Sequence, residues 1–243
     1  MEIALITGAN RGLGFETAKQ LLTLGYRVII TARNLESGNE ALTELKEVSE
    51  HVELMTLDVT SESQQKELAY NLKEKYGKLD VLVNNAGAYF ELDGGWVGNT
   101  ALNVTQEALK QTFDVNFFSV VSLTQKLVPL IEKSENGRIV NVSSIMGSCG
   151  IHADLNGGMA DVKPLAYDAS KTALNAFTIH LAKALQHKGI SVNSVHPGWV
   201  ATEMGTELAP MTIPEGAKTL VDMANDKTGS TGKFIHLREE LPW

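Results

Sequence analysis

The sequence of 243 residues predicts a single α/β domain, in which helices flank a doubly wound parallel sheet of about seven strands. Short apolar runs rich in β-branched residues alternate with longer stretches in which apolar residues recur at helical spacing. Parallel strands need crossover connections, which the helical stretches provide. A glycine-rich segment also follows the first strand, and this combination is typical of the Rossmann fold.

The elements follow one another in a regular order. Strands are predicted at residues 2–6, 27–31, 52–57, 79–83, 138–142 and 190–195, with a final edge strand at 232–236. Helices are predicted at residues 14–24, 35–48, 61–76, 105–131 and 167–187. In such sheets ligands bind outside the carboxyl ends of the strands. The loops 88–104, 147–166 and 198–213 are therefore expected to form the substrate pocket.

The composition narrows the possible classes of function. The hydrophobic content of 43% is ordinary for a globular protein, and no apolar run is long enough to span a membrane. A net charge of −8 with dispersed basic residues argues against a nucleic-acid surface. The start of the chain shows no export signal, and the single cysteine, Cys149, suits a reducing compartment. A cytoplasmic location is expected.

The segment after the first predicted strand is suited to binding phosphate. The run Thr7-Gly8-Ala9-Asn10-Arg11-Gly12-Leu13-Gly14 joins the apolar residues 2–6 to a helical pattern. Glycines let the backbone turn tightly and approach an anion, and a helix N-terminus presents unpaired N–H groups to a pyrophosphate. A dinucleotide is the expected ligand, and a glycine-rich turn without any ligand is the alternative.

Tyr167 and Lys171 lie four residues apart and so share one face of a predicted helix. A cation beside a phenol favours the phenolate and lowers its pKa, which suits proton transfer. Upstream, the strand 138–142 ends in Ser143 and Ser144, where one hydroxyl can face a substrate. The structural alternatives are a half-buried tyrosine beside a solvated lysine, and serines that cap a turn.

Taken together, these motifs resemble the short-chain dehydrogenase/reductase family over nearly the whole chain, from Thr7 to Thr202. The glycines have the family's G-x-x-x-G-x-G spacing, and residues 84–87, Asn116, Ser144, the Tyr167/Lys171 pair and residues 196–202 follow in the family's order. Within the family the resemblance is closest to NADPH-dependent carbonyl reductases. It rests on residues 31–33, 115–118, 142–146 and 197–200 and on the final Trp243.

The resemblance implies hydride transfer between a nicotinamide and a carbonyl carbon, with four catalytic residues. Tyr167 is expected to be the general acid in reduction, and Ser144 to hydrogen-bond the carbonyl oxygen. Lys171 is expected to lower the pKa of Tyr167 and to bind the nicotinamide ribose. Asn116 is expected to interrupt its helix and to position a water that connects the pair with solvent.

The choice of cofactor depends on two arginines. Ala32 stands where NAD-selective sites usually carry an acid, while Arg33 and Arg11 can converge on a 2′-phosphate. The sequence therefore favours NADP(H) as the cofactor. The alternative is that both arginines are solvated surface residues without a ligand. The whole chain, residues 1–243, is accordingly expected to be one NAD(P)-binding domain. The resemblance assigns cofactor contacts to Gly8, Asn10, Arg11, Gly12, Leu13, Gly14, Arg33, Asp58, Val59, Asn85, Ala86, Gly87, Tyr167, Lys171, Pro197, Gly198, Val200 and Thr202. The structural alternative for residues 84–85 is a turn, and the structural alternative for Asp58 is a helix cap, in place of a cofactor contact.

Apolar side chains in the loops favour an apolar or aromatic carbonyl substrate. His152 and Asp154 lack a third ligand at a recognisable spacing, so no metal site is expected. The segment between Ser144 and Tyr167 is longer than in most relatives and is expected to shape the substrate mouth and to disfavour a tetramer. Substrate contacts are expected from Ser144, Ile145, Met146, Tyr167 and Trp199, with Tyr89, Phe90, Trp96 and Met204 nearby.

The sequence therefore predicts an NADPH-dependent oxidoreductase that reduces a ketone, aldehyde or quinone to the alcohol. A 3-oxoacyl-carrier-protein reductase and a hydroxysteroid dehydrogenase are the enzymatic alternatives. A regulator that senses NADP(H) without turnover is the alternative from another class. The expected partner is a small molecule, while monomer, dimer and tetramer all stay open, as do the physiological substrate, its stereochemistry and the direction of flux.

Overall fold

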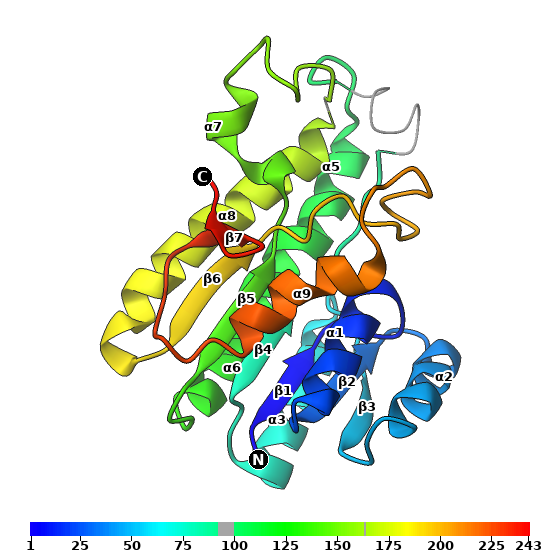
Figure 1. Cartoon of the computed structure of the whole chain (residues 1–243), viewed down its shortest axis with the longest axis vertical. Coiled ribbons are helices and arrows are strands. Elements are labelled where there is room, and N and C mark those ends of the chain that lie inside the picture. The colour runs from blue at the N-terminus through cyan, green and yellow to red at the C-terminus, as the bar shows by residue number, and fades with distance from the viewer. Residues whose placement is uncertain (92–99, 163) are drawn as a thin grey trace.

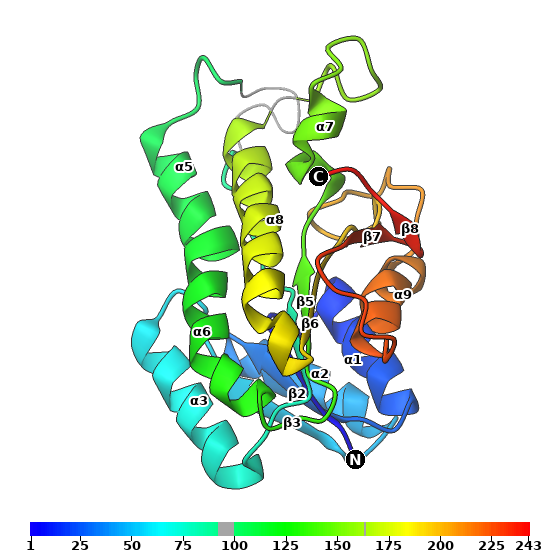
Figure 2. The ribbon, with the colours of Figure 1, turned by 90° about the vertical axis from the view of Figure 1, so that its left-hand side faces the viewer.

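A computed structural model describes residues 1–91, 100–162 and 164–243 of the chain. In these residues one eight-stranded sheet has the strand order β3-β2-β1-β4-β5-β6-β7-β8, with helices on both of its faces (Figures 1 and 2). The order reverses between β1 and β4, which is the topological switch point where α/β sheets bind ligands. The predicted doubly wound fold is confirmed.

The strands lie close to the predicted ranges. They are β1 Ile3–Ile6, β2 Arg27–Ala32, β3 Val52–Thr56, β4 Val81–Asn84, β5 Arg138–Val142, β6 Ser191–Val195, β7 Phe234–His236 and β8 Glu239–Glu240. The first seven pair in parallel, and β8 pairs antiparallel to β7. The segment predicted as the final edge strand, 232–236, contains β7, but the edge of the sheet is formed by one further strand, β8. Two exposed glutamates give β8 no apolar pattern that could have revealed it.

The helices form one layer on each face of the sheet, as Figure 2 shows. One layer holds α1 Gly12–Thr23, α2 Leu35–Lys46 and α9 Ile213–Ala224. The other holds α3 Glu62–Tyr76, α5 Gln106–Phe113, α6 Ser119–Ile131 and α8 Leu165–Leu185. The segment of α9 was not among the predicted helices, although Thr212 and Glu215 form a capping box at its start.

Alternate residues of the central strands face opposite layers, because side chains of a strand alternate between faces. Ala4 and Ile6 of β1 belong to the core under α1, α2 and α9, whereas Ile3 and Leu5 belong to the core under α3, α6 and α8. Both faces of the strand are thus buried. This explains why the predicted strands show continuous apolar runs instead of alternation.

The long helix predicted at 105–131 is divided by a π-helical segment, Asp114–Phe118, between α5 and α6. The extra residue per turn in such a segment rotates the side chains that follow. Asn116 lies in this segment and is buried, which agrees with the expected interruption of the helix.

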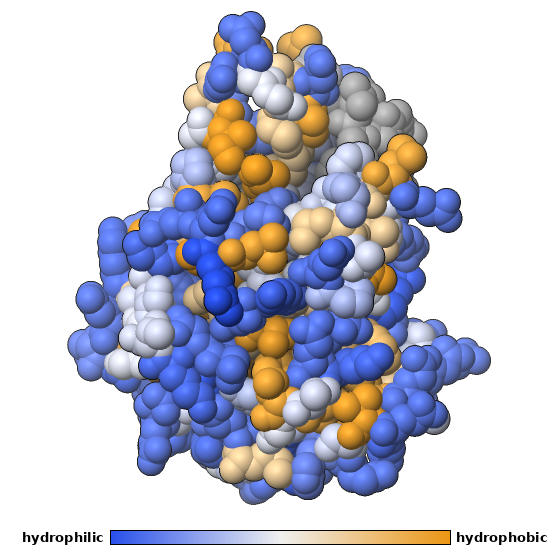
Figure 3. All heavy atoms as spheres, viewed as in Figure 1, coloured by the Kyte–Doolittle hydropathy of each residue, from blue (hydrophilic) through white to orange (hydrophobic). Residues whose placement is uncertain are grey.

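The described parts of the irregular segments after β4, β5 and β6 gather at the end of the molecule opposite the N-terminus (Figure 1). After β5 the chain forms a 3₁₀ turn, Ile145–Gly147, and the short helix α7, Cys149–His152. On the face that Figure 3 shows, hydrophobic side chains lie among polar ones near the loops. Leu155, Trp199 and Leu208 of these segments are exposed. Trp96 lies outside the described residues. None of the described helices is long and apolar enough to cross a membrane.

A chain of buried polar side chains joins the centre of the sheet to α8. Asn84 Nδ2 donates to Asn141 Oδ1 at 2.8 Å, and Asn141 Nδ2 donates to Thr178 Oγ1 at 2.8 Å. Thr178 Oγ1 also lies 2.8 Å from Ser194 Oγ. Buried polar groups need such partners, so the chain fixes α8 laterally on β4, β5 and β6.

We expect Asn141→Ala to lower the free energy of unfolding by about 1–3 kcal/mol, because buried partners of the amide lose their hydrogen bonds. Urea unfolding followed by circular dichroism would measure the change. Thr43→Ala, which removes an exposed hydroxyl bonded within α2, is the control and should change stability by less than about 0.5 kcal/mol. Equal effects of the two substitutions would contradict this role of Asn141.

Candidate active site

The glycine-rich segment leaves the start of α1 open to an anion. Gly8 and Gly12 have positive φ angles of 62° and 59°. A Cβ at Gly14 would lie 2.8 Å from the carbonyl oxygen of Gly8, so this position accepts only glycine without a shift. No side chain among the described residues caps α1, and its first turn has no acid. The free N–H groups and the helix dipole suit a phosphate.

The end of β4 braces this segment from behind. Asn85 Nδ2 donates to the carbonyl oxygens of Thr7 and Gly8 at 2.8 and 3.1 Å. The backbone N–H groups of Asn85 and Ala86 both donate to Thr7 Oγ1 at 3.0 Å. Asn85 is therefore more than a turn residue, since it fixes the conformation of the glycine segment.

The two arginines that are expected to bind a 2′-phosphate are both exposed, and one of them has an acidic partner. Ala32 is the buried last residue of β2, and Arg33 follows it and is exposed. Arg11 Nη1 pairs with Glu203 Oε2 at 2.7 Å, and both side chains are largely exposed. An exposed ion pair of this kind is weak, so the guanidinium is readily available to another anion.

Asp58 and Val59 follow β3 at the same end of the sheet. Asp58 Oδ1 accepts bonds from the N–H and the hydroxyl of Thr60 at 2.9 and 2.7 Å. The cap of α3 is Ser61, whose hydroxyl accepts the N–H of Gln64. The alternative that Asp58 itself caps the helix is therefore wrong.

Ser144, Tyr167 and Lys171 meet at the carboxyl end of β5, where all three are more than nine-tenths buried. The hydroxyl of Ser144 is hydrogen-bonded to the phenol of Tyr167 and also accepts the N–H of Met146 at 3.2 Å. Lys171 Nζ donates to the carbonyl oxygen of Val142 at 2.8 Å and lies 5.5 Å from the centroid of the Tyr167 ring. The alternative of a half-buried tyrosine beside a solvated lysine is wrong.

Burial dominates the protonation of this group. Desolvation raises the pKa of Tyr167 well above its usual value, with a contribution from Asp168, while the bond to Ser144 opposes the change. Desolvation also lowers the pKa of Lys171 to about 8. Loss of hydration dominates the pKa of Tyr167, and the expectation that Lys171 lowers this pKa stays a prediction. The phenol is neutral at pH 7.

Asn116 is held by contacts on both ends of its amide. Its Oδ1 accepts the N–H of Ala88 at 2.8 Å, and its Nδ2 donates to the carbonyl of Ala88 at 2.9 Å and to Ser170 Oγ at 3.1 Å. Gly87 lies between Asn116 and Lys171, since a Cβ there would be 3.5 Å from Asn116 Oδ1 and 3.7 Å from Lys171 Nζ. Gly87 therefore lies within contact distance of both polar side chains.

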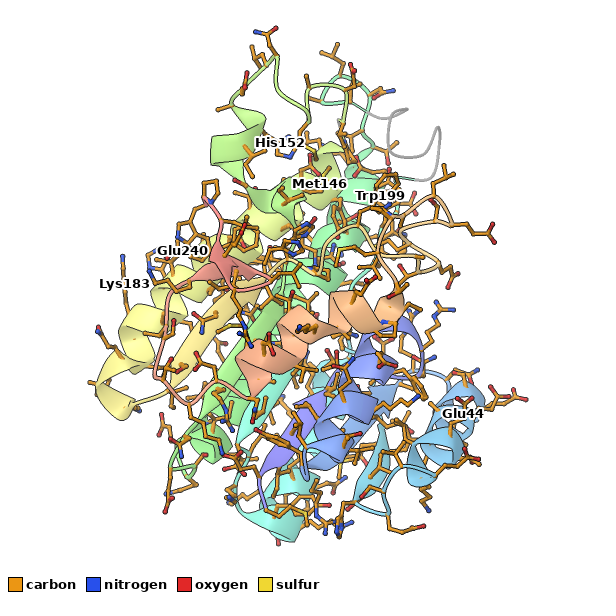
Figure 4. The ribbon with its side chains drawn as sticks, in the orientation of Figure 1. Glu44, Met146, His152, Lys183, Trp199 and Glu240 are labelled. Carbon is orange, nitrogen blue, oxygen red and sulfur yellow. The ribbon has the colours of Figure 1, made fainter. Side chains whose placement is uncertain are left out.

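The segment after β6 makes contacts within itself at the same end of the sheet. Val200 forms a bridge with Met211, and Gly198 has a φ angle of 92° after Pro197. Thr202 Oγ1 accepts the N–H of Gly205 at 3.1 Å. Trp199 is exposed, and its Nε1 donates to the carbonyl of Gly205 at 2.6 Å. Figure 4 labels Trp199 and Met146, which come from the segments after β6 and β5 at the upper end of the sheet.

An acidic group beside Tyr167 was not predicted. Glu91 is 1% exposed, and its Oε2 accepts the backbone N–H of Tyr167 at 2.9 Å. Burial and the charge of Glu91 raise the pKa of Asp168 to about 8. His152 Nε2 lies 3.9 Å from Asp168 Oδ2, and Figure 4 shows His152 near the start of α8. The described residues contain no group of three or more metal-ligating side chains of the His, Cys, Asp and Glu types.

A cavity of about 450 Å³ opens beside Asp168. It is lined by Thr100, Ala101, Leu102, Leu165 and Asp168. Residues 100–102 and the start of α8 therefore line the same cavity. No sequence motif marks Glu91, and Asp168 gives a signal only as an acid next to Tyr167 on a predicted helix.

Comparisons with known proteins agree with this geometry. A family model described as short chain dehydrogenase matches residues 2–212. Salutaridine reductase of Papaver bracteatum is 34% identical, and the match covers 99% of this chain and 96% of that protein. Two solved structures are similar over all or nearly all of both chains: NADPH-bound carbonyl reductase from chicken fatty liver, with 27% identity and a TM-score of 0.86, and carbonyl reductase Sniffer of D. melanogaster, with 29% identity and a TM-score of 0.85.

The lowered pKa of Lys171 predicts an alkaline gain in stability. The unfolded chain keeps this proton up to about pH 10.4, whereas the folded chain loses it near pH 8. Between these values the unfolded state binds more protons, so the free energy of unfolding rises with pH, by up to about 3 kcal/mol. Urea titrations from pH 7.5 to 10 would measure the rise, which Lys171→Met should lack. If the free energy of unfolding changed with pH in the same way in the wild type and in Lys171→Met, the lowered pKa of buried Lys171 would be contradicted.

Proposed function

The chain belongs to the short-chain dehydrogenase family of oxidoreductases, and we propose that it is an NADPH-dependent reductase that converts a ketone, aldehyde or quinone to the alcohol. The predicted resemblance to carbonyl reductases within this family is confirmed. The observation that carries the proposal is the buried contact between the Ser144 hydroxyl and the neutral Tyr167 phenol, beside Lys171. A cytoplasmic location and the oligomeric state stay predictions.

The chemistry follows from the state of these side chains. Ser144 donates a hydrogen bond to the substrate carbonyl oxygen and stabilises the negative charge that grows on it. Tyr167 then gives its phenolic proton to the same oxygen, because burial keeps the phenol protonated at neutral pH. Lys171 holds the ribose of the nicotinamide, and Asn116 positions the water through which Tyr167 regains its proton. Ile145, Met146 and Trp199 contact the rest of the substrate.

The residues at the other end fit the cofactor. NADP(H) supplies the hydride to the carbonyl carbon when it is bound. The uncapped start of α1, with Gly8, Gly12 and Gly14, binds the pyrophosphate. Thr202 and the Val200 backbone contact the nicotinamide end. Asn10, Leu13, Asp58, Val59, Asn85, Ala86, Gly87, Pro197 and Gly198 complete the proposed cofactor site.

The selectivity for NADPH depends on Arg11 and Arg33. Ala32 offers no carboxylate to the ribose 2′-hydroxyl, and the two guanidinium groups are exposed at the same end of the sheet. Arg11 would bind a 2′-phosphate in place of Glu203, because a phosphate accepts stronger charge-assisted bonds than a solvated surface carboxylate.

Tyr167→Phe should lower the rate of carbonyl reduction by about a thousandfold or more, while the affinity for NADPH changes by less than about threefold. The loss of NADPH absorbance with a panel of aromatic, aliphatic and acyl-thioester carbonyls would measure the rate, and fluorescence titration the affinity. Tyr26→Phe is the control, since this tyrosine bonds to Asn225 away from the site. A wild-type protein that binds NADPH but reduces no carbonyl would favour the sensing regulator.

The double substitution Arg11→Ala and Arg33→Ala should weaken NADPH binding by about a hundredfold or more, and NADH binding by less than about threefold. The reason is that only NADPH carries the 2′-phosphate. Dissociation constants for both cofactors would measure the difference. Arg238→Ala is the control, because this arginine is exposed and pairs with Asp222 on α9. Equal losses for the two cofactors would refute the assignment.

A further inference from the structure

We propose that Glu91 is a positioning residue for the reaction. Its carboxylate fixes the first turn of α8 and thereby holds Tyr167 against Ser144, and it ties the segment after β4 to the proton donor. The inference rests on the proposed function, in which Tyr167 gives the proton. It adds a residue that no family motif of the sequence marks.

Among the described residues, no side chain adjacent in sequence caps the start of α8. Pro164 occupies the N-cap position and makes no side-chain bond to the helix. Glu91 supplies the missing acceptor from 76 residues away, at 2.9 Å from the N–H of Tyr167. By contrast α2, α3, α5 and α9 are each capped by an adjacent side chain, namely Asn34, Ser61, Thr105 and Thr212. The cap of α8 is therefore also a tertiary contact.

A carboxylate at this place has a cost that a purely structural cap would avoid. Glu91 is 1% exposed, and its Oε1 has no hydrogen-bond partner among the described residues. Its charge also faces Asp168, whose pKa it raises. A serine or asparagine at position 164 would cap the helix without burying an acid. Glu91 differs from such a cap in its long side chain, which connects the segment after β4 to the first turn of α8.

The segment from Ala88 to Glu91 holds Tyr167 from two sides. Asn116 binds both the N–H and the carbonyl of Ala88, which anchors the start of the segment. The ring of Tyr89 packs edge-on against the ring of Tyr167, with 5.9 Å between centroids. Glu91 then binds the backbone of Tyr167. Ring and backbone of the proton donor are thus both set by one short segment of chain.

Three substitutions separate the hydrogen bond from the charge. Glu91→Gln keeps the acceptor oxygen and removes the charge, Glu91→Asp keeps the charge but withdraws the acceptor by one methylene, and Glu91→Ala removes both. With the full chain, NADPH and a ketone that the wild type reduces, Glu91→Gln should retain kcat within about threefold. Glu91→Asp and Glu91→Ala should lower kcat by about ten- to a hundredfold, with the KM for NADPH changed by less than about threefold.

Asp80→Ala is the matched control for lost stability. Asp80 is also a buried carboxylate that accepts a backbone N–H, that of Ile3 at 2.8 Å, but it lies at the opposite end of the sheet. It should lower the urea midpoint while kcat of the folded protein stays within about twofold. If Glu91→Ala does not fold, the comparison of Glu91→Gln with Glu91→Asp decides.

The outcomes distinguish this inference from the proposed function. Wild-type kcat in Glu91→Asp and Glu91→Ala would overturn the positioning role. Equal losses in all three variants would overturn it too, because the retained acceptor of glutamine would then have no effect. Full reduction by Tyr167→Phe would overturn the proposed function and this inference with it. Loss in Tyr167→Phe with an unaffected Glu91 series would overturn the inference alone.

Discussion

The buried hydrogen bond from the Lys171 ammonium to the Val142 carbonyl is the contact on which the reactive end depends. It joins α8 to the last residue of β5, so Tyr167, one turn before Lys171, meets Ser144, two residues after Val142. Gly147 allows the close approach, since a Cβ there would lie 2.7 Å from the backbone of Lys171. A buried ammonium is costly, and this carbonyl offsets part of the lost hydration.

The end of β4 links this reactive end to the phosphate end. Asn85 fixes the glycine segment through Thr7 and Gly8, and a few residues later Ala88 is held by Asn116. Glu91 then reaches the backbone of Tyr167. Three residues of one seven-residue segment, Asn85, Ala88 and Glu91, therefore contact the proposed phosphate site, the π-helical segment and the proposed proton donor. The relative positions of both ends are set by a single stretch of backbone.

Local patterns in the sequence predicted most of the sheet, because buried parallel strands produce apolar runs that a single sequence displays. The π-helical segment could be expected at Asn116 only through family resemblance, since helical periodicity continues across residues 105–131. Thr212, Pro214 and Glu215 mark the start of α9, but this helix was not predicted. The predicted loop 198–213 ended there without a helix assigned after it. Glu91 could not be found, because its partner lies 76 residues away and no spacing rule connects them.

The same limit applies to electrostatics. The spacing of Tyr167 and Lys171 placed them on one face of a helix, but the sign of the pKa change depends on burial, which spacing does not reveal. With desolvation dominant, the phenol keeps its proton at neutral pH, and Lys171 with a pKa of about 8 is still mostly charged. A neutral phenol is the form that donates to an alkoxide, whereas alcohol oxidation needs the phenolate. The resting protonation state of this site is therefore the one that the proposed reduction requires.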